Sequence, residues 1–581
     1  MSQQGETERQ ATPHRTEEIT GAELLVRTLV RLGVADAFNI VGLGLFPLAE
    51  ALYAHRDRIR YVTALNETNL ALMATGYARA AGSAAFVNVY HASGTALGMM
   101  GVTTAWAEQV PLVYTTTSSS RALSGRDQYA AVPRAATEMS GQFVKWSAEV
   151  PSAARIPELL ARAFQIATTP PYGPVHLSFP MDVWLETADD TSDAVGMLEL
   201  FGAPAAAPAA IDRLEEILRE SRSPLLVAGG EVARYAGVEA LVSLAESTGA
   251  AVSSEDKISD PGFPTTHPQF IGKLGANRDA VSQADAIVLL GVELTESGLT
   301  APIDFGEATT VTVSADPLAL TRQLRPDVAV LGAPRPTLEA LAERFLRHPL
   351  PADALQRRIE AATVLHRRRE LRSDALRAIR FDADELAISR IITEIDDAMP
   401  EGTILVNHCA SGEPFVEELL PVDETGDYFG ISSKASAQGW GGPAAIGIQL
   451  ARPTRRVVAL LGDGGFMFSS TAIHAAAQQR LPVVFVILDN GGWRDIGALA
   501  RVARSPLADA EQEFGWEFDP PIDHAAFARS LGLDAHTART AQELRHALAE
   551  AFASDRPSLI AVRNAPEDAD EFSRVFTQRE G

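Results

Sequence analysis

The stretch Leu461-Gly-Asp-Gly-Gly-Phe466 decides the fold of the C-terminal third of this chain. It ends the apolar run of residues 456–461 and is followed by a helical pattern and a second apolar run, residues 482–488. That second run ends in Asp489-Asn490-Gly491-Gly492. Strand, turn, helix, strand and turn form a βαβ unit, whose two turns lie at the carboxyl edge of a parallel sheet, where α/β folds bind ligands.

The two turns carry residues that suit a metal and a phosphate group. Asp463 and Asn490 can meet at the sheet edge and offer a carboxylate and an amide oxygen, the donors that Mg²⁺ prefers. Gly462, Gly464 and Gly465 allow close approach of a diphosphate to the backbone. Gly-Asp-Gly alone also serves as an ordinary turn, so the hypothesis of a site depends on its pairing with Asn490.

Apolar runs of strand length recur along the chain and alternate with helical patterns. They are residues 85–89, 111–114, 224–228, 286–290, 456–461 and 482–488. Unbroken β-branched and leucine runs are typical of parallel strands buried on both faces. We therefore predict an α/β protein with three doubly wound, mainly parallel-sheet domains.

Two stretches of different composition separate the three blocks. The first is Phe201-Gly-Ala-Pro-Ala-Ala-Ala-Pro-Ala-Ala210, and the second surrounds Arg347-His-Pro-Leu-Pro351. The predicted division is a disordered lead at 1–17, domains at 18–190, 205–348 and 375–566, and a tail at 567–581.

Composition narrows the classes of partner. With 50 Lys and Arg against 75 Asp and Glu, the net charge is −25, so we expect no binding to nucleic acid or membranes. The single cysteine, Cys409, excludes an intrachain disulfide. Residues 1–18 are polar and lack the apolar segment of a signal peptide. A cytoplasmic enzyme is the expectation.

At this point the residues carry a family resemblance. Gly462-Asp463-Gly464 followed by Asp489-Asn490 resembles the signature of thiamine-diphosphate-dependent enzymes of the decarboxylase and acetolactate-synthase group. Further similar segments are Ala64-Leu-Asn-Glu67, Ala74-Thr-Gly-Tyr-Ala-Arg79, Ser93-Gly-Thr95, Phe143-Val-Lys-Trp-Ser147, Gly173-Pro-Val-His-Leu177, Ala284-Asp-Ala-Ile-Val-Leu-Leu-Gly291 and Gly442-Pro-Ala-Ala-Ile-Gly447. The resemblance spans nearly the whole chain and implies a pyrimidine-binding, a central and a diphosphate-binding domain, in that order.

The resemblance also implies roles for the cofactor-binding residues. Glu67 would hydrogen-bond the aminopyrimidine ring and promote its imino tautomer, although a glutamate before a helical run also commonly meets the helix dipole. Asp463 and Asn490 would bind Mg²⁺ by their side chains and Gly492 by its carbonyl oxygen. Gly42 and Ser411 would join Gly462, Gly464 and Gly465 in contacting the cofactor.

The expected substrate side departs from the benzoylformate decarboxylase branch, which the segments otherwise match most closely. Leu43 stands in place of a serine and Tyr90 in place of a histidine, and residues 293–298 lack the histidine of the central domain. These departures argue against benzoylformate as the substrate. Gln438 falls where the family has a Met, Leu or Ile wedged under the cofactor, and it could act as the wedge, bind substrate, or mark an inactive protein.

Further polar residues fall on loops that should face the cofactor. His91 and His408 are candidate proton donors, each equally readable as a loop histidine bonded to backbone. Trp493 and Arg494 are candidate substrate contacts, and Arg494 is more commonly a surface ion-pair partner in such a position. Cys409 is expected to be a buried small residue.

The resulting hypothesis is a thiamine-diphosphate and Mg²⁺ enzyme, most simply a decarboxylase that converts a 2-oxo acid to an aldehyde. An acetolactate-synthase-like carboligase and a catalytically inactive cofactor-binding homologue are the alternatives. Val227-Ala-Gly-Gly-Glu231 lacks a full dinucleotide fingerprint, so we do not expect FAD. The resemblance implies a homodimer or homotetramer with active sites between chains.

Overall fold

The computed structural model describes residues 17–40, 42, 44–123, 126, 135–196, 204–294, 303–322, 324–378, 381, 385–432, 434–509 and 515–565. The expected tail at 567–581, and the lead apart from residue 17, lie outside these ranges. Three six-stranded sheets form the framework, and every strand pair within them is parallel. The prediction of three α/β blocks with parallel sheets is confirmed.

The first sheet has the order β3-β2-β4-β5-β7-β6. Its strands are β2 (Asp36–Asn39), β3 (Arg60–Val62), β4 (Ala85–Tyr90), β5 (Leu112–Ser118), β6 (Ser147–Glu149) and β7 (Pro174–Pro180). Its helices are α1 (Gly21–Arg31), α2 (Phe46–Ala54), α3 (Glu67–Ala81), α4 (His91–Ala107) and α5 (Ile156–Thr168). A separate antiparallel pair, β1 (Glu18–Thr20) with β8 (Thr187–Asp189), brings the two ends of this domain together.

The second sheet has the order β11-β10-β9-β12-β13-β14. Its strands are β9 (Pro224–Ala228), β10 (Ala251–Ser254), β11 (Phe270–Lys273), β12 (Ala286–Leu290), β13 (Thr309–Ser314) and β14 (Val328–Leu331). The helices are α6 (Pro208–Glu220), α7 (Gly230–Arg234), α8 (Val238–Thr248), α9 (Arg278–Gln283), α10 (Pro334–Arg347) and the long connecting α11 (Ala352–Ala378).

The third sheet has the order β16-β15-β17-β18-β20-β19. Its strands are β15 (Ile404–His408), β16 (Tyr428–Phe429), β17 (Val457–Gly462), β18 (Val484–Asp489), β19 (Asp534–Ala538) and β20 (Ser558–Arg563). The helices are α12 (Ile388–Ala398), α13 (Glu413–Leu419), α14 (Gly441–Ala451), α15 (Asp463–Met467), α16 (Ile473–Gln479), α17 (Arg494–Val502), α18 (His524–Ser530) and α19 (Ala541–Ala553). Strands such as β18 are buried along their whole length because helices cover both faces of the sheet.

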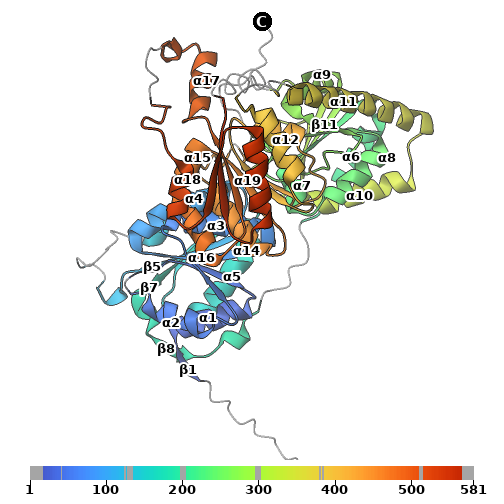
Figure 1. Cartoon of the computed structure of the whole chain (residues 1–581). Helices are drawn as coiled ribbons and strands as arrows, with labels where there is room; N and C mark the ends of the chain where they lie inside the picture. The colour runs from blue at the N-terminus through green and yellow to red at the C-terminus, as the bar shows by residue number, and fades with distance from the viewer. Residues whose placement is uncertain are drawn as a thin grey trace, which may run out of the picture.

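The first and third domains share one hydrophobic core, and helices α3 and α14 cross within it. In Figure 1 the third domain, in orange and red, lies above the first, in blue and teal, with the green and yellow central domain beside the third. At the crossing, a Cβ on Gly447 would overlap the carbonyl oxygen of Met73, and one on Gly76 would overlap that of Ala444. Only glycine therefore permits this approach of the two helices.

Arg79, near the end of α3, joins all three domains. Its guanidinium donates to the carbonyl oxygen of Gly430 at 2.7 Å, to that of Ser259 at 2.8 Å, and to the carboxylate of Asp260 at 2.8 Å. The three blocks are therefore linked by buried polar contacts as well as by apolar packing.

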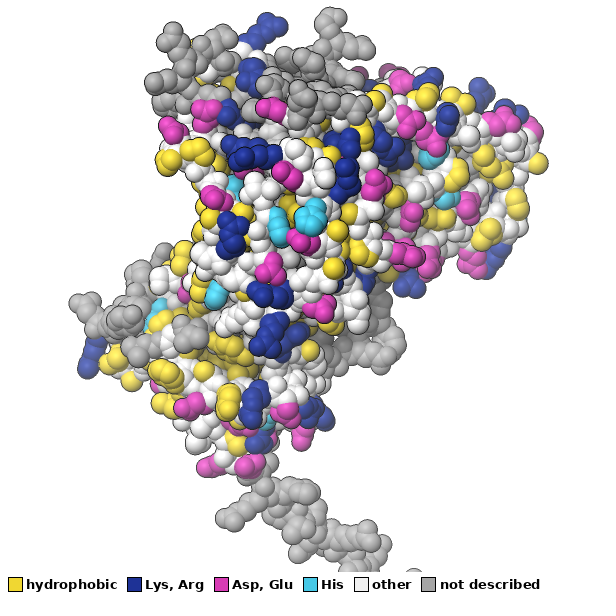
Figure 2. Space-filling model, in the orientation of Figure 1, with side chains coloured by type: hydrophobic (Ala, Val, Ile, Leu, Met, Phe, Trp, Pro, Cys, Tyr) yellow, Lys and Arg dark blue, Asp and Glu magenta, His cyan; other side chains and the backbone are white. Residues whose placement is uncertain are grey.

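Charged side chains of both signs are interspersed on the face shown in Figure 2, as the sequence composition leads one to expect of a surface without a broad basic patch. In the described part of the chain, every helix is too short or too polar to cross a membrane.

Candidate active site

The turns after β17 and β18 meet, as the βαβ pattern predicts. These strands are direct neighbours, with Gly462 opposite Leu488, so Asp463 and Asn490 both emerge at the carboxyl edge of the sheet. The Asp463 carboxylate accepts hydrogen bonds from the amides of Gly464 (2.8 Å), Gly491 (2.9 Å) and Gly492 (2.8 Å). One side chain thus fixes both turns.

The Asp463 carboxylate lies in an environment that favours a cation. Burial and the nearby charge of Asp489 raise the pKa of Asp463 to about 7, although the three backbone amides oppose this rise. A divalent cation at this position would stabilise the ionised form.

Asn490 supplies the second oxygen. Its Oδ1 atom is buried and, among the described residues, has no hydrogen-bond partner. A buried acceptor without a partner destabilises the folded state unless it binds a hydrogen-bond donor or a cation. Asp463 and Asn490 therefore fit the oxygen-only ligand set of Mg²⁺, with the carbonyl of Gly492 in the adjoining turn as the expected third ligand.

Gly492 occupies a backbone position that demands glycine. Its φ is +147°, and a Cβ there would overlap the carbonyl oxygen of Trp516. It forms an isolated antiparallel bridge with Glu517, flanked by hydrogen bonds from Phe518 N to Gly491 O and from Trp493 N to Trp516 O. The bridge connects the turn after β18, residues 489–492, to a later segment of the chain. We call residues 489–492 the metal turn, after its expected role.

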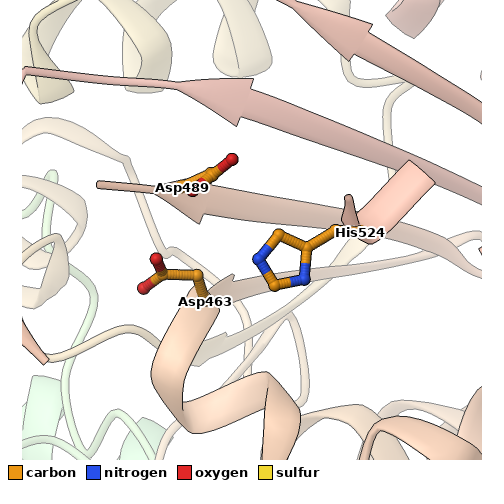
Figure 3. A group of neighbouring side chains, drawn as sticks. All are labelled: Asp463, Asp489 and His524. Atoms are coloured by element: carbon orange, nitrogen blue, oxygen red, sulfur yellow. The ribbon is translucent and has the colours of Figure 1, made fainter. Parts of the chain in front are cut away.

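A second group of possible ligands shares Asp463. Asp463, Asp489 and His524 each offer an atom within 4.8 Å of the others, from the starts of α15 and α18 and the end of β18 (Figure 3). Arg563 pairs with Asp489 at 2.7 Å and so offsets part of its charge. Mg²⁺ prefers oxygen donors to imidazole, and the Asn490 side of Asp463 therefore suits it better.

The expected diphosphate side lies at the ends of β15 and β17. Residues 409–412, which we call the diphosphate loop, include the buried Ser411, whose Oγ lies 3.7 Å from the Cys409 sulfur. Burial raises the pKa of Cys409 to about 12, so its thiol stays protonated, in agreement with the expected role as a small buried residue. Gly462 lies beside this sulfur, because a Cβ on it would be 3.7 Å away.

Gln438 faces the glycine turn. It is exposed, and its Oε1 lies 3.7 Å from where a Cβ on Gly465 would be. Its side chain is thus placed over the turn on which the cofactor is expected. Whether it supports the cofactor or contacts substrate stays a prediction.

His408, at the end of β15, differs from the expected proton donor with a near-neutral pKa. Burial, with a smaller effect of Lys257, lowers the pKa of His408 to about 3, so its ring is neutral at pH 7. Its Nδ1 accepts a 3.3 Å hydrogen bond from the amide of Gly441, which places the proton on Nε2. The ring can therefore donate a hydrogen bond only as a neutral group.

Trp493 and Arg494 stabilise the metal turn. The Trp493 indole packs so closely on Gly464 that a Cβ there would overlap it. Arg494 pairs with Glu517 at 2.5 Å and donates from Nε to the Asn490 carbonyl at 3.3 Å. Arg494 thus has an ion-pair partner, which is the commoner role of an arginine in such a position.

Glu67 is the first residue of α3, in the first domain. Asn66 caps this helix by accepting the amide of Asn69 at 2.8 Å. The Glu67 carboxylate is half-buried and lies close to Gly94, where a Cβ would be 2.7 Å from its Oε1. Burial, with a contribution from the charge of Glu67, raises the pKa of Tyr114 well above its usual value.

Tyr90 and His91 lie side by side at the end of β4. Their ring centroids are 3.9 Å apart, and His91 has a left-handed φ of +57°, which is uncommon for residues other than glycine. Burial lowers the pKa of His91, so this ring too is neutral at pH 7. Gly42 packs against the Tyr90 ring, whereas Leu43 lies outside the described residues.

Carboxylates fill the ligand edge of the central sheet. Glu255 accepts the amides of Gly230 and Glu293, each at 2.9 Å, and Glu231 accepts the amide of Ala315 at 3.2 Å. A dinucleotide phosphate would need such amides as donors. In this structure those amides bind carboxylates, and the expectation of no FAD stays a prediction.

Several neighbours of the site were not singled out from the sequence. Asp489 lies within the family motif, and its place directly before Asn490 is the signal in the sequence that it borders the site. His524, Arg563 and Lys257 are distant in the sequence and belong to no pattern that would place them there.

The fold and the site define an α/β protein of three parallel-sheet domains, with a buried pair of turns in the third domain whose oxygen donors suit a divalent cation. This chain matches the three domains of the thiamine pyrophosphate enzyme family. The N-terminal TPP-binding domain matches residues 19–139, the central domain residues 211–341 and the C-terminal TPP-binding domain residues 412–562. Benzoylformate decarboxylase of Pseudomonas aeruginosa is 33% identical over 92% of this chain and 97% of its own length.

Two further comparisons agree. A probable acetolactate synthase large subunit of Methanocaldococcus jannaschii is 26% identical over 94% of this chain and 92% of its own. The solved structure of the thiamine diphosphate-dependent 4-hydroxybenzoylformate decarboxylase of Rhodococcus jostii superposes with a TM-score of 0.80 at 26% identity, covering 94% of this chain and 99% of that one. This chain belongs to the thiamine pyrophosphate enzyme family, as the sequence motifs predict.

Proposed function

We propose that this protein uses thiamine diphosphate and Mg²⁺ to cleave or form a carbon–carbon bond next to a carbonyl, most simply by decarboxylating a 2-oxo acid to an aldehyde. The observation that carries the proposal is the joined pair of turns in which buried Asp463 and the open Oδ1 of Asn490 meet. When bound, thiamine diphosphate supplies the carbon nucleophile and the electron sink for the bond that breaks.

The residues of the third domain would bind and orient the cofactor. Asp463, Asn490 and the Gly492 carbonyl would hold Mg²⁺. Ser411 and the glycines of the turn, Gly462, Gly464 and Gly465, would border the diphosphate. Gln438, which faces Gly465, would limit where the rest of the cofactor lies.

The proton-handling residues would come from two domains. Glu67 would hold a proton against a ring nitrogen of the cofactor. His408 would donate its Nε2 hydrogen as a neutral ring, while Tyr90 and His91, beside Gly42, would border the substrate. Trp493 is exposed enough to touch a substrate, and Arg494 would act by holding the turn rather than by pairing with substrate.

A second copy of the chain would complete the site. Large apolar side chains are exposed on the first domain, among them Phe46 (61%), Leu65 (56%) and Leu97 (51%), and on the third domain at Phe468 (53%). Hydrophobic side chains also gather on the lower block of the face in Figure 2. Surfaces of this kind mark subunit contacts, and Leu65 lies two positions from Glu67. On this basis we propose a homodimer or homotetramer with active sites between chains, and a cytoplasmic location stays a prediction.

The reaction can be tested on protein reconstituted with Mg²⁺ and thiamine diphosphate. A panel of aryl and alkyl 2-oxo acids given alone should release carbon dioxide and aldehyde. The similarity to an acetolactate synthase makes carboligation the second candidate, and a hydroxyketone formed only when an acceptor carbonyl is added would establish it. Cofactor binding without turnover of any panel member would favour the inactive homologue instead.

A further inference from the structure

Two lysines of the central domain reach helix α13, at the edge of the diphosphate side. Lys257, in the segment after β10, lies 3.3 Å (Nζ to Oε2) from Glu413, the first residue of α13. Lys273, at the end of β11, pairs with Glu417 one turn later. The amide of Ile258 also donates to Glu417, at 3.3 Å. Three contacts from the central domain thus converge on one short helix.

Helix α13 and the diphosphate loop form one unit. The Cys409 carbonyl accepts the amides of Gly412 (3.1 Å) and Glu413 (2.8 Å), so the loop passes into the helix without a flexible joint. Ser411, the expected diphosphate contact, lies in the chain between the acceptor, Cys409, and the two donors. Displacement of Glu413 would therefore displace Ser411.

The helix depends on outside contacts for its position. It has seven residues, too few for stability without tertiary support. The Glu417 side chain is 1% exposed and also accepts from the Tyr428 hydroxyl at 3.3 Å, which in turn accepts from Asn407 at 3.1 Å. These contacts connect the lysines of the central domain to strands β15 and β16. The two lysine–glutamate ion pairs are thus among the contacts that hold α13 in position.

We propose that Lys257 and Lys273 are positioning residues: through Glu413 and Glu417 the central domain sets the position of the diphosphate loop, and thereby the affinity for thiamine diphosphate. This inference rests on the proposed function. It gives the central domain a part in cofactor binding that needs no ligand of its own. Lys257 acts through Glu413 and not by touching the cofactor.

The test compares the full-length wild-type protein first with Lys257→Met, Glu413→Gln and the double variant. The dissociation constant of thiamine diphosphate is measured by calorimetry at saturating Mg²⁺, with kcat at saturating cofactor and Tm of the cofactor-free protein alongside. We expect Lys257→Met to weaken binding about tenfold, as loss of an outer-shell partner commonly does, with kcat and Tm nearly unchanged. Lys257→Arg should restore most of the affinity, because its guanidinium can pair with Glu413.

A matched control removes a different ion pair between the same two domains. Lys434 pairs with Glu293 at 3.4 Å and does not contact α13, so Lys434→Met should leave the affinity for thiamine diphosphate unchanged. An equal loss of affinity in this control would overturn the inference.

The double variant separates an indirect from a direct role. If Lys257 acts through Glu413, the double variant binds cofactor no more weakly than the weaker-binding single variant. Additive losses would show that Lys257 acts independently of Glu413 and would overturn the positioning role. Unchanged affinity in Lys257→Met, with normal binding by the wild type, would overturn this inference alone, whereas a wild type that binds no thiamine diphosphate would overturn the proposed function and the inference with it.

Discussion

The Asp463 carboxylate accepts the amide of Gly492 at 2.8 Å, so the residue expected to bind Mg²⁺ also fixes the turn that should supply the third ligand. The same oxygen, Oδ2, accepts the Gly491 amide at 2.9 Å. The geometry of one turn therefore depends on the side chain of the other, and the protein itself holds the expected ligand atoms in position.

Replacement of Asn490 should separate metal binding from folding. Asn490→Leu removes an amide whose Oδ1 makes no hydrogen bond within the described structure, so the Tm of the metal-free protein should not fall. The affinity for Mg²⁺, measured by calorimetry in the presence of thiamine diphosphate, should fall by about 10–100-fold or more. Asn490→Asp keeps an oxygen donor and should retain binding. A lower Tm with unchanged Mg²⁺ affinity would assign Asn490 to the fold.

Replacement of Glu67 should affect turnover alone. Glu67→Gln keeps the shape of the side chain beside Gly94 but cannot exchange a proton, so kcat should fall by about 100-fold or more. Thiamine diphosphate binding and Tm should stay at wild-type values. Glu158→Gln, on the exposed surface of α5, is the control. Activity above a tenth of wild type in Glu67→Gln would remove this residue from proton transfer.

Two substitutions distinguish the possible roles of Gln438. If its bulk over Gly465 supports the cofactor, Gln438→Leu should keep most of kcat while Gln438→Ala loses about tenfold. If the amide instead hydrogen-bonds substrate, both variants should lose activity equally and KM should rise. Steady-state kinetics with the best 2-oxo acid of the panel will show which holds.

Stability should fall as the pH rises through the range in which Glu255 ionises. Burial, together with the charge of Glu293, raises the pKa of Glu255 to about 8 from its ordinary value of 4.5, while two backbone amides and Arg234 oppose the rise. Between these two pH values the folded chain holds a proton on Glu255 that the unfolded chain releases. The contribution of protonated Glu255 to the free energy of unfolding is therefore full below pH 4.5 and lost by about pH 8.

Burial also raises the pKa values of Glu231 and Glu293, which lie in the same buried group. All three carboxyl groups therefore lower the stability of the fold as the pH rises. Urea unfolding at pH 5.5 and 8 should show a loss of up to a few kcal/mol at the higher pH. Glu255→Gln should lessen that loss, although it starts from lower stability because one hydrogen bond is gone. An unchanged slope would exclude Glu255 as its source.

The glycine crossing of α3 and α14 should not tolerate a methyl group. Gly447→Ala would drive a Cβ into the Met73 carbonyl and cost about 1–3 kcal/mol of unfolding free energy or more. Gly442→Ala, on the same helix, meets its nearest neighbour at 3.7 Å and should be neutral or slightly stabilising. Equal effects of the two substitutions would mean that the helices can separate at little cost.

The sequence predicted those features that follow from local pattern and strand order. The apolar run before Gly462 and the one before Asp489 specified two parallel strands, and the edge rule then brought Asp463 and Asn490 together. The family motifs predicted a pyrimidine-binding, a central and a diphosphate-binding domain in that order, and the comparisons confirm the three domains of the family.

Burial and distant partners could not be predicted. The low pKa of His408 depends on how deeply its strand end is covered and on Lys257 from another domain. His524 enters the Asp463 neighbourhood from a helix that no motif marks. The Arg494 ion pair needed a partner, Glu517, whose position is set by the bridge at Gly492.

The crossing of α3 and α14 has a further consequence if the protein assembles as proposed. Helix α3 begins at Glu67, and α14 begins three residues after Gln438. In a dimer whose sites lie between chains, Glu67 and Gln438 of one chain would serve different sites. The two helices, which meet without side chains between them at Gly76 and Gly447, would then place the start of one active site in direct backbone contact with the element leading into another, with little room for one helix to move without the other.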